Sequence, residues 1–116
     1  NMWFQKIINK WKSKKEGSIY KYTTIKKVQS FSEIPKVVGS TIYLVGSVQS
    51  NKWVVLKCPC GDSGRIEVNL MKSCYPNWRL KIKEKNISLW PSIVANHNGH
   101  TCHFWLKGNK VEWSWY

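Results

Sequence analysis

The chain has 116 residues, which is enough for one domain with one modest hydrophobic core. No apolar stretch approaches the roughly 18 residues that a membrane span needs, and the first residues show no secretory leader, so we expect a cytoplasmic protein. The formal charge of +13 favours nucleic acid, anionic lipid or an acidic protein as a partner. Only one aspartate and five glutamates are present, so reactions that need paired carboxylates have little support.

An amphipathic basic helix is expected over residues 1–16. Lysines fill most of its polar positions and Gly17 ends the pattern, while the apolar residues that recur at helical spacing are Trp3, Phe4, Ile7, Ile8 and Trp11. Such a helix can lie on an anionic membrane surface. It can also pack its aromatic stripe on the domain or on a partner, which is the interpretation we favour.

Residues 18–116 are expected to form a single β domain. Runs of β-branched and aromatic residues, several with alternating polar and apolar side chains, are separated by turn signals. Gly108-Asn109 between the last two runs is a strong hairpin signal. The predicted strands are Tyr20–Lys26, Thr41–Val48, Lys52–Lys57, Arg65–Leu70, Trp78–Lys83, Ile87–Trp90, His103–Lys107 and Lys110–Trp115. Their spacing predicts a mostly β fold, as a small antiparallel sheet or a barrel-like domain.

The cysteines and histidines favour a metal site over disulfides. An even cysteine count in a secreted protein would suggest disulfides, but no secretory signal is visible and the histidines lie in one run with a cysteine. The residues concerned are Cys58, Cys60, Cys74 and Cys102, together with His97, His100 and His103. Thiolates and imidazoles together select zinc over magnesium or calcium, so we predict one zinc ion within the β domain.

Cys58 and Cys60 are the firmest zinc ligands. Residues two apart in an extended chain point the same way, so both thiolates can reach one ion. The candidates for the remaining positions are His103, His100 and Cys102. The residues left outside the site are His97, expected in a solvated loop, and Cys74, expected as a partly buried thiol.

Ser92 lies in the segment 90–93, Trp-Pro-Ser-Ile, shortly before the histidine run. A serine after a proline in a loop is commonly a turn residue or a cap, and the residues by themselves favour that role. Beside a zinc ion, Ser92 could instead hydrogen-bond a metal-bound water or an oxyanion. A histidine at the same site could act as its general base.

Several short motifs occur in a fixed order over residues 41–115: Tyr43-Leu44-Val45-Gly46, Cys58-Pro59-Cys60-Gly61, Asn69-Leu70, Pro76-x-Trp78, Ser88-Leu89-x-Pro91-Ser92-Ile93 and His103-Phe104-Trp105, then Gly108 and Trp113. The series resembles a family of small bacterial proteins of unknown function. Their genes often lie beside those for ubiquitin-like, activating-enzyme-like and conjugating-enzyme-like proteins. The resemblance implies a metal-binding β domain that acts as a peptidase on the ubiquitin-like modifier. By position, Cys58, Cys60 and His103 match the family's metal motifs, and Ser92 matches its serine.

Two positions depart from the family's pattern. Many members have a third cysteine where this chain has Asp62, and a cysteine three residues before the His-Phe pair where this chain has His100. Either the metal ligands of this chain differ from those of the family, or this member is degenerate.

Three functions are therefore considered. The first is a zinc-binding peptidase that processes or removes a ubiquitin-like modifier, with Ser92 and His103 as catalytic residues. The second is a non-catalytic, zinc-stabilised module that binds a ubiquitin-like protein or its conjugating enzymes. The third, a nucleic-acid-binding protein, is less favoured because the basic residues are nearly all lysine, which recognises phosphates and bases in a less fixed geometry than arginine.

Overall fold

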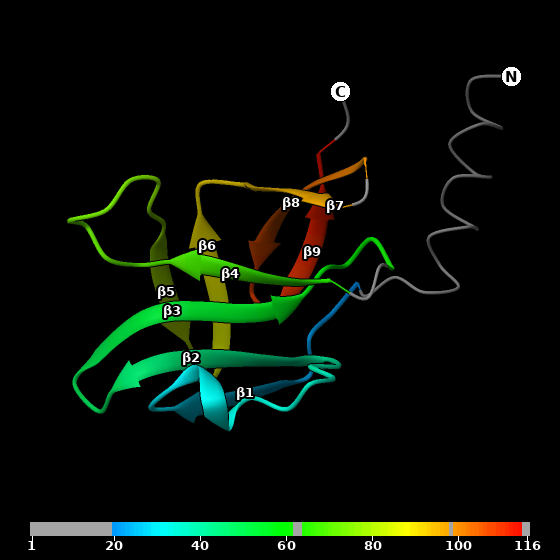
Figure 1. Ribbon diagram of the computed structural model, residues 1–116. Helices are drawn as coiled ribbons and strands as arrows, with labels where there is room; N and C mark the ends of the chain where they lie inside the picture. Colours follow the sequence, from blue (N-terminus) through cyan, green and yellow to red (C-terminus); the bar gives the residue numbers. More distant parts are fainter. Residues whose placement is uncertain (1–19, 62–63, 98, 115–116) are drawn as a thin grey trace, which may run out of the picture.

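The regular structure of the described residues consists of nine strands and one short 3-10 helix (Figure 1). The computed structural model describes residues 20–61, 64–97 and 99–114. The elements are β1 (Thr24–Val28), η1 (Phe31–Glu33), β2 (Thr41–Ser47), β3 (Ser50–Lys57), β4 (Arg65–Asn69), β5 (Arg79–Lys83), β6 (Asn86–Trp90), β7 (Ile93–His97), β8 (His100–Lys107) and β9 (Lys110–Trp113). The mostly β prediction is thus confirmed, whereas the helix predicted over residues 1–16 lies outside the described residues. Within those residues, no helix has the length and apolar character to span a membrane.

The strands form three sheets rather than one. The first has the order β1-β2-β3-β4, the second pairs β5 with β6, and the third has the order β7-β8-β9. All neighbouring strands are antiparallel except β1 and β2, which run parallel. A parallel pair needs a crossover connection, and residues 29–40 with η1 provide it. The strands were predicted to form a small antiparallel sheet or a barrel-like domain; in the structure they form three small sheets.

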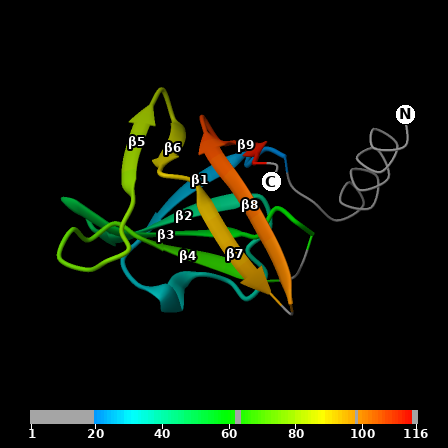
Figure 2. The same cartoon turned by 90° about the horizontal axis from the view of Figure 1, so that it is seen from above.

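One hydrophobic cluster joins all three sheets. It includes Leu44 and Leu56 from the first sheet, Ile87 from the second, and Phe104 and Leu106 from the third. Figure 2 shows β7 and β8 running across the strands of the four-stranded sheet. Because alternate residues of a strand point to opposite faces, one face of β8 enters this core and the other points away from it.

The turn between β8 and β9 holds strand β6 in place. Gly108 and Asn109 both have positive φ, at 56° and 67°, which is the conformation of a tight hairpin turn, so the predicted hairpin is confirmed. The buried Asn109 side chain accepts a hydrogen bond from the backbone N–H of Ile87 at 2.7 Å, and the backbone N–H of Asn109 donates to the Ile87 carbonyl at 2.8 Å. These bonds fix β6 against the β8–β9 hairpin.

The largest difference from the sequence interpretation is β7. No strand was predicted over residues 93–97, where His97 was expected in a loop, and the next strand was predicted to begin at His103. Ile93–His97 and His100–Lys107 instead form a hairpin whose register pairs Ile93 with Phe104. The first strand also begins at Thr24 rather than at Tyr20. Polar residues interrupt the alternating pattern in the 93–97 segment, which is why the pattern did not indicate a strand.

Candidate active site

A serine and a histidine meet where β6 passes into β7. The Ser92 Oγ lies 2.8 Å from Nε2 of His103, within the range of a strong hydrogen bond, and both residues are half-buried. Ser92 precedes β7, and His103 lies on the neighbouring strand β8, opposite Val94. Residues 11 positions apart in the chain thus form a serine–histidine pair.

The backbone around Ser92 is fixed from two sides. The Trp78 indole Nε1 donates a hydrogen bond to the Ser92 carbonyl at 3.1 Å. Ile93, the next residue, is buried and pairs with the buried Phe104, which follows His103. These anchors set the distance between Ser92 and His103. The sequence placed Trp78 only on a strand face, because a contact between an indole and a distant carbonyl leaves no trace in a local pattern.

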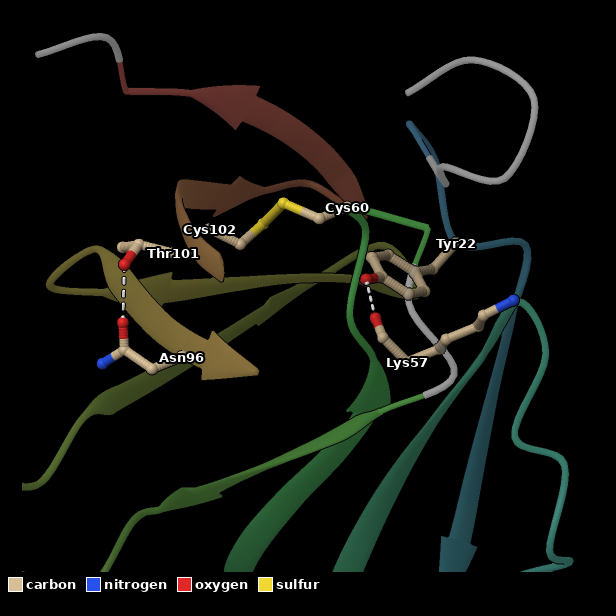
Figure 3. The surroundings of a disulfide bond; sticks show 6 residues. All are labelled: Tyr22, Lys57, Cys60, Asn96, Thr101 and Cys102. Atoms are coloured by element: carbon tan, nitrogen blue, oxygen red, sulfur yellow. Dashed lines mark hydrogen bonds between the residues drawn. A yellow bond between two sulfur atoms is a disulfide. The ribbon is translucent and has the colours of Figure 1, made fainter. Parts of the chain in front are cut away.

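Three cysteines form a second cluster on the inner side of the same hairpin. Cys60 and Cys102 are joined by a disulfide (Figure 3). The sulfur atoms of Cys58, Cys60 and Cys102 all lie within 4.8 Å of one another. Cys58 follows β3 and is fully buried, with its backbone N–H bonded to the Gly64 carbonyl at 2.9 Å. The structure therefore brings together three of the predicted metal ligands, two of them as a disulfide.

His103 lies apart from this cluster. Cys102 and His103 are consecutive residues of β8, so their side chains point to opposite faces of the strand. Cys102 is buried in the core, while His103 is half-buried and contacts Ser92. His103 was predicted both as a zinc ligand and as a base. In the structure the three sulfurs form the cluster without it, and His103 contacts Ser92 instead. The side chains of His97 and His100 lie outside what the structure describes.

Tyr22 lies near the cysteine cluster, beside the backbone that leads into Cys58. Its phenol is fully buried and donates a hydrogen bond to the Lys57 carbonyl, next to Cys58 (Figure 3). Burial raises the pKa of the Tyr22 phenol well above its usual range, and the negative charge of a Cys58 thiolate raises it further. Cys74 is exposed rather than partly buried and takes no part in the cluster.

Comparison with known families agrees with the serine–histidine geometry. A family model described as bacterial ubiquitination-like system serine protease (BubE) matches residues 29–114. No curated protein and no solved structure gives a significant match. The matched segment covers about three quarters of the chain and contains every described residue of both clusters. The chain is therefore a member of the BubE family.

Proposed function

We propose that this protein is a serine peptidase that cleaves the bond following a ubiquitin-like modifier, with Ser92 as nucleophile and His103 as general base. The observation that carries this proposal is the 2.8 Å contact between Ser92 Oγ and His103 Nε2. A serine hydroxyl is a weak nucleophile until a base within hydrogen-bond reach takes its proton. The description of the family as a serine protease supports a serine nucleophile.

The reaction follows from these two side chains. The Ser92 Oγ attacks the scissile carbonyl carbon while Nε2 of His103 takes the hydroxyl proton. The resulting imidazolium then gives that proton to the leaving amine nitrogen as the carbon–nitrogen bond breaks, which leaves an acyl-enzyme on Ser92. Water next attacks the ester with His103 again as base, and the carboxylic acid leaves as Ser92 regains its proton. Direct attack by Ser92 is favoured over a zinc-bound water because His103 faces Ser92 and not the sulfur cluster.

The substrate class comes from the family. Its description places the serine protease in a bacterial ubiquitination-like system. We infer that the substrate is a ubiquitin-like protein extended or conjugated at its C-terminus, and that the partners include the enzymes that conjugate it. The non-catalytic module considered above remains the second candidate, since it would use the same partners.

The cysteine cluster fits zinc only in its reduced form. Three sulfurs within 4.8 Å of one another are the soft donors that zinc prefers, but two sulfurs in a disulfide carry no negative charge for the ion. We propose that the reduced protein binds one zinc ion through Cys58, Cys60 and Cys102, and that this zinc stabilises the fold. When bound, the ion would replace the covalent link between the β3–β4 connection and β8.

Cleavage assays with matched variants test the catalytic roles. A ubiquitin-like protein from the same system, extended at its C-terminus, serves as substrate, and a fluorophosphonate probe reports the reactivity of the serine. Ser92→Ala should keep the thermal stability of the parent but lose at least about a thousandfold in turnover. His103→Ala should lose probe labelling as well. Ser47→Ala, at an exposed serine on β2, is the control and should behave like the parent. Parent-like cleavage by Ser92→Ala would refute the assignment.

Metal content tests the zinc proposal separately. Reduced protein, incubated with zinc and desalted, should hold about one equivalent, and Cys58→Ser should lose it. Cys74→Ser removes an exposed cysteine outside the cluster and should keep the metal. Equal zinc content in the two variants would refute the site, and chelation should lower the melting temperature because binding energy contributes to folding.

A further inference from the structure

A groove lies beside the serine–histidine pair, between the β5–β6 hairpin and β8. Its volume is about 430 Å³, and it is bordered by Trp90 and Trp105, with Leu80 and Leu89 among the lining residues. The backbone N–H of Gly108 donates a hydrogen bond at 2.8 Å to Oγ of Ser88, which also lines the groove. This bond holds the two walls of the groove together. The groove is thus a feature of two packed elements and not of a loose loop.

Trp90 and Trp105 both lie close to the catalytic pair in the sequence. Trp90 is two residues before Ser92, and Trp105 is two residues after His103 on the same face of β8. Two residues of a strand span about 7 Å. A peptide extended along this face would therefore place in the groove a side chain about two residues from the scissile bond.

The rim of the groove is positively charged. Arg79 is exposed and its guanidinium lies 4.8 Å from the centroid of the Trp90 ring. Lys107 lies 5.4 Å from the Trp105 ring centroid and pairs with Glu112 at 3.2 Å. Lys81 is also exposed in the lining, and none of the described lining residues is acidic. The Trp90 ring is 56% exposed, so an apolar group can reach it beside these cations.

We propose that this groove binds the acyl side of the substrate, as an extended peptide with an apolar side chain about two residues before the scissile bond and a carboxylate two residues further from that bond, on the same face of the peptide. The apolar side chain packs between Trp90 and Trp105, and the carboxylate pairs with Arg79 and Lys81. The proposal rests on the proposed function for its choice of side. In a peptidase that removes a modifier, the modifier's tail is common to all substrates while the leaving group varies, so specificity is built on the acyl side.

Peptide binding tests the groove without requiring turnover. Full-length Ser92→Ala protein is titrated with short fluorescein-labelled peptides that carry leucine in the second position before the carboxyl end and glutamate two residues before the leucine. Replacing leucine by serine, or glutamate by lysine, should each weaken binding about tenfold. Trp105→Ala, and separately the exposed double change Arg79→Gln with Lys81→Gln, should weaken the original peptide by a similar factor of about ten. Lys26→Gln, at an exposed lysine of β1, removes a positive charge elsewhere and should have little effect.

The outcomes separate the groove from the catalytic proposal. Suppose that the fluorophosphonate labels the parent, while the groove variants bind the peptide with the same affinity as Lys26→Gln. The groove assignment is then wrong and the peptidase assignment stands. If labelling fails while peptide binding depends on Trp105 and Arg79, the groove assignment stands and the catalytic one falls. A short oligothymidylate that binds more tightly than the peptide and is lost in the same variants would overturn the peptide assignment in favour of nucleic acid.

Discussion

Reduction of the Cys60–Cys102 disulfide should cost the fold a large part of its stability. The bond joins the β3–β4 connection to β8 across a sequence separation of 42 residues. In the chain-entropy description of a cross-link, a closed loop of this length destabilises the unfolded state by about 4 kcal/mol. Small domains have unfolding free energies of about 5 to 15 kcal/mol, so the reduced protein should be markedly less stable.

Urea unfolding of the parent with and without reductant measures this difference and requires no substitution. A chelator is added to both samples so that zinc cannot replace the lost cross-link. The midpoint should move to lower urea in the reduced sample. Zinc added in place of the chelator should restore part of the loss, because the three sulfurs can then bind the ion.

Two cysteine variants provide the matched comparison. Cys60→Ser removes the cross-link at a half-buried position and should unfold like the reduced parent, and its stability should no longer respond to reductant. Cys74→Ser should respond to reductant as the parent does, since Cys74 is exposed and outside the cluster. If reductant shifts the parent's unfolding free energy by less than about 1 kcal/mol, the cross-link does not stabilise the fold as the loop length predicts.

Three further changes test the fold and the surroundings of the site. Alanine at Gly46 would place its Cβ 2.1 Å from a backbone oxygen and should cost at least about 3 kcal/mol of unfolding free energy; Gly39→Ala, with nothing within 4 Å of its Cβ, should cost only about 1 kcal/mol for its positive φ. Asn109→Ala leaves the buried Ile87 N–H without its acceptor and should cost about 2 kcal/mol in urea unfolding; a smaller loss than in Gly39→Ala would contradict this. Since burial holds the pKa of Tyr22 above its ordinary value of 10.0, the unfolded state releases that proton first as pH rises. The unfolding free energy should therefore fall as the pH rises above 10.0, and it should fall less steeply in Tyr22→Phe. An equal slope in the parent and the variant would show that other groups control this pH dependence.

Local pattern was sufficient to predict most strands. The strand predicted over Arg65–Leu70 is present as β4, in which the alternate residues Ile66 and Val68 are buried. Gly108-Asn109 predicted a hairpin because few residues adopt positive φ without strain, and that turn is present. Signals of this kind depend on neighbours in the chain, so they can be read without knowledge of the fold.

Which side chains meet was decided by the tertiary structure. Sequence motifs singled out Ser92, His103 and the three clustered cysteines, but they predicted one site in which His103 was a candidate zinc ligand as well as a catalytic base. In strand β8 the Cys102 side chain lies in the core, and the His103 side chain points to the opposite face. There it contacts Ser92, which follows the end of β6. That separation depends on a hairpin, β7–β8, whose pattern was too irregular to predict.

The amino-acid sequence by itself determined the β-rich composition, the turns and the set of reactive residues, because these follow from the intrinsic preferences and chemistry of each side chain. Only the tertiary structure divided those residues into a serine–histidine pair and a cysteine cluster. It also brought the Trp78 indole to the Ser92 carbonyl and placed Trp90 and Trp105 in the lining of one groove. Contacts of this kind join residues from different strands, and they exist only once the packing of the three sheets has fixed the faces and registers of those strands.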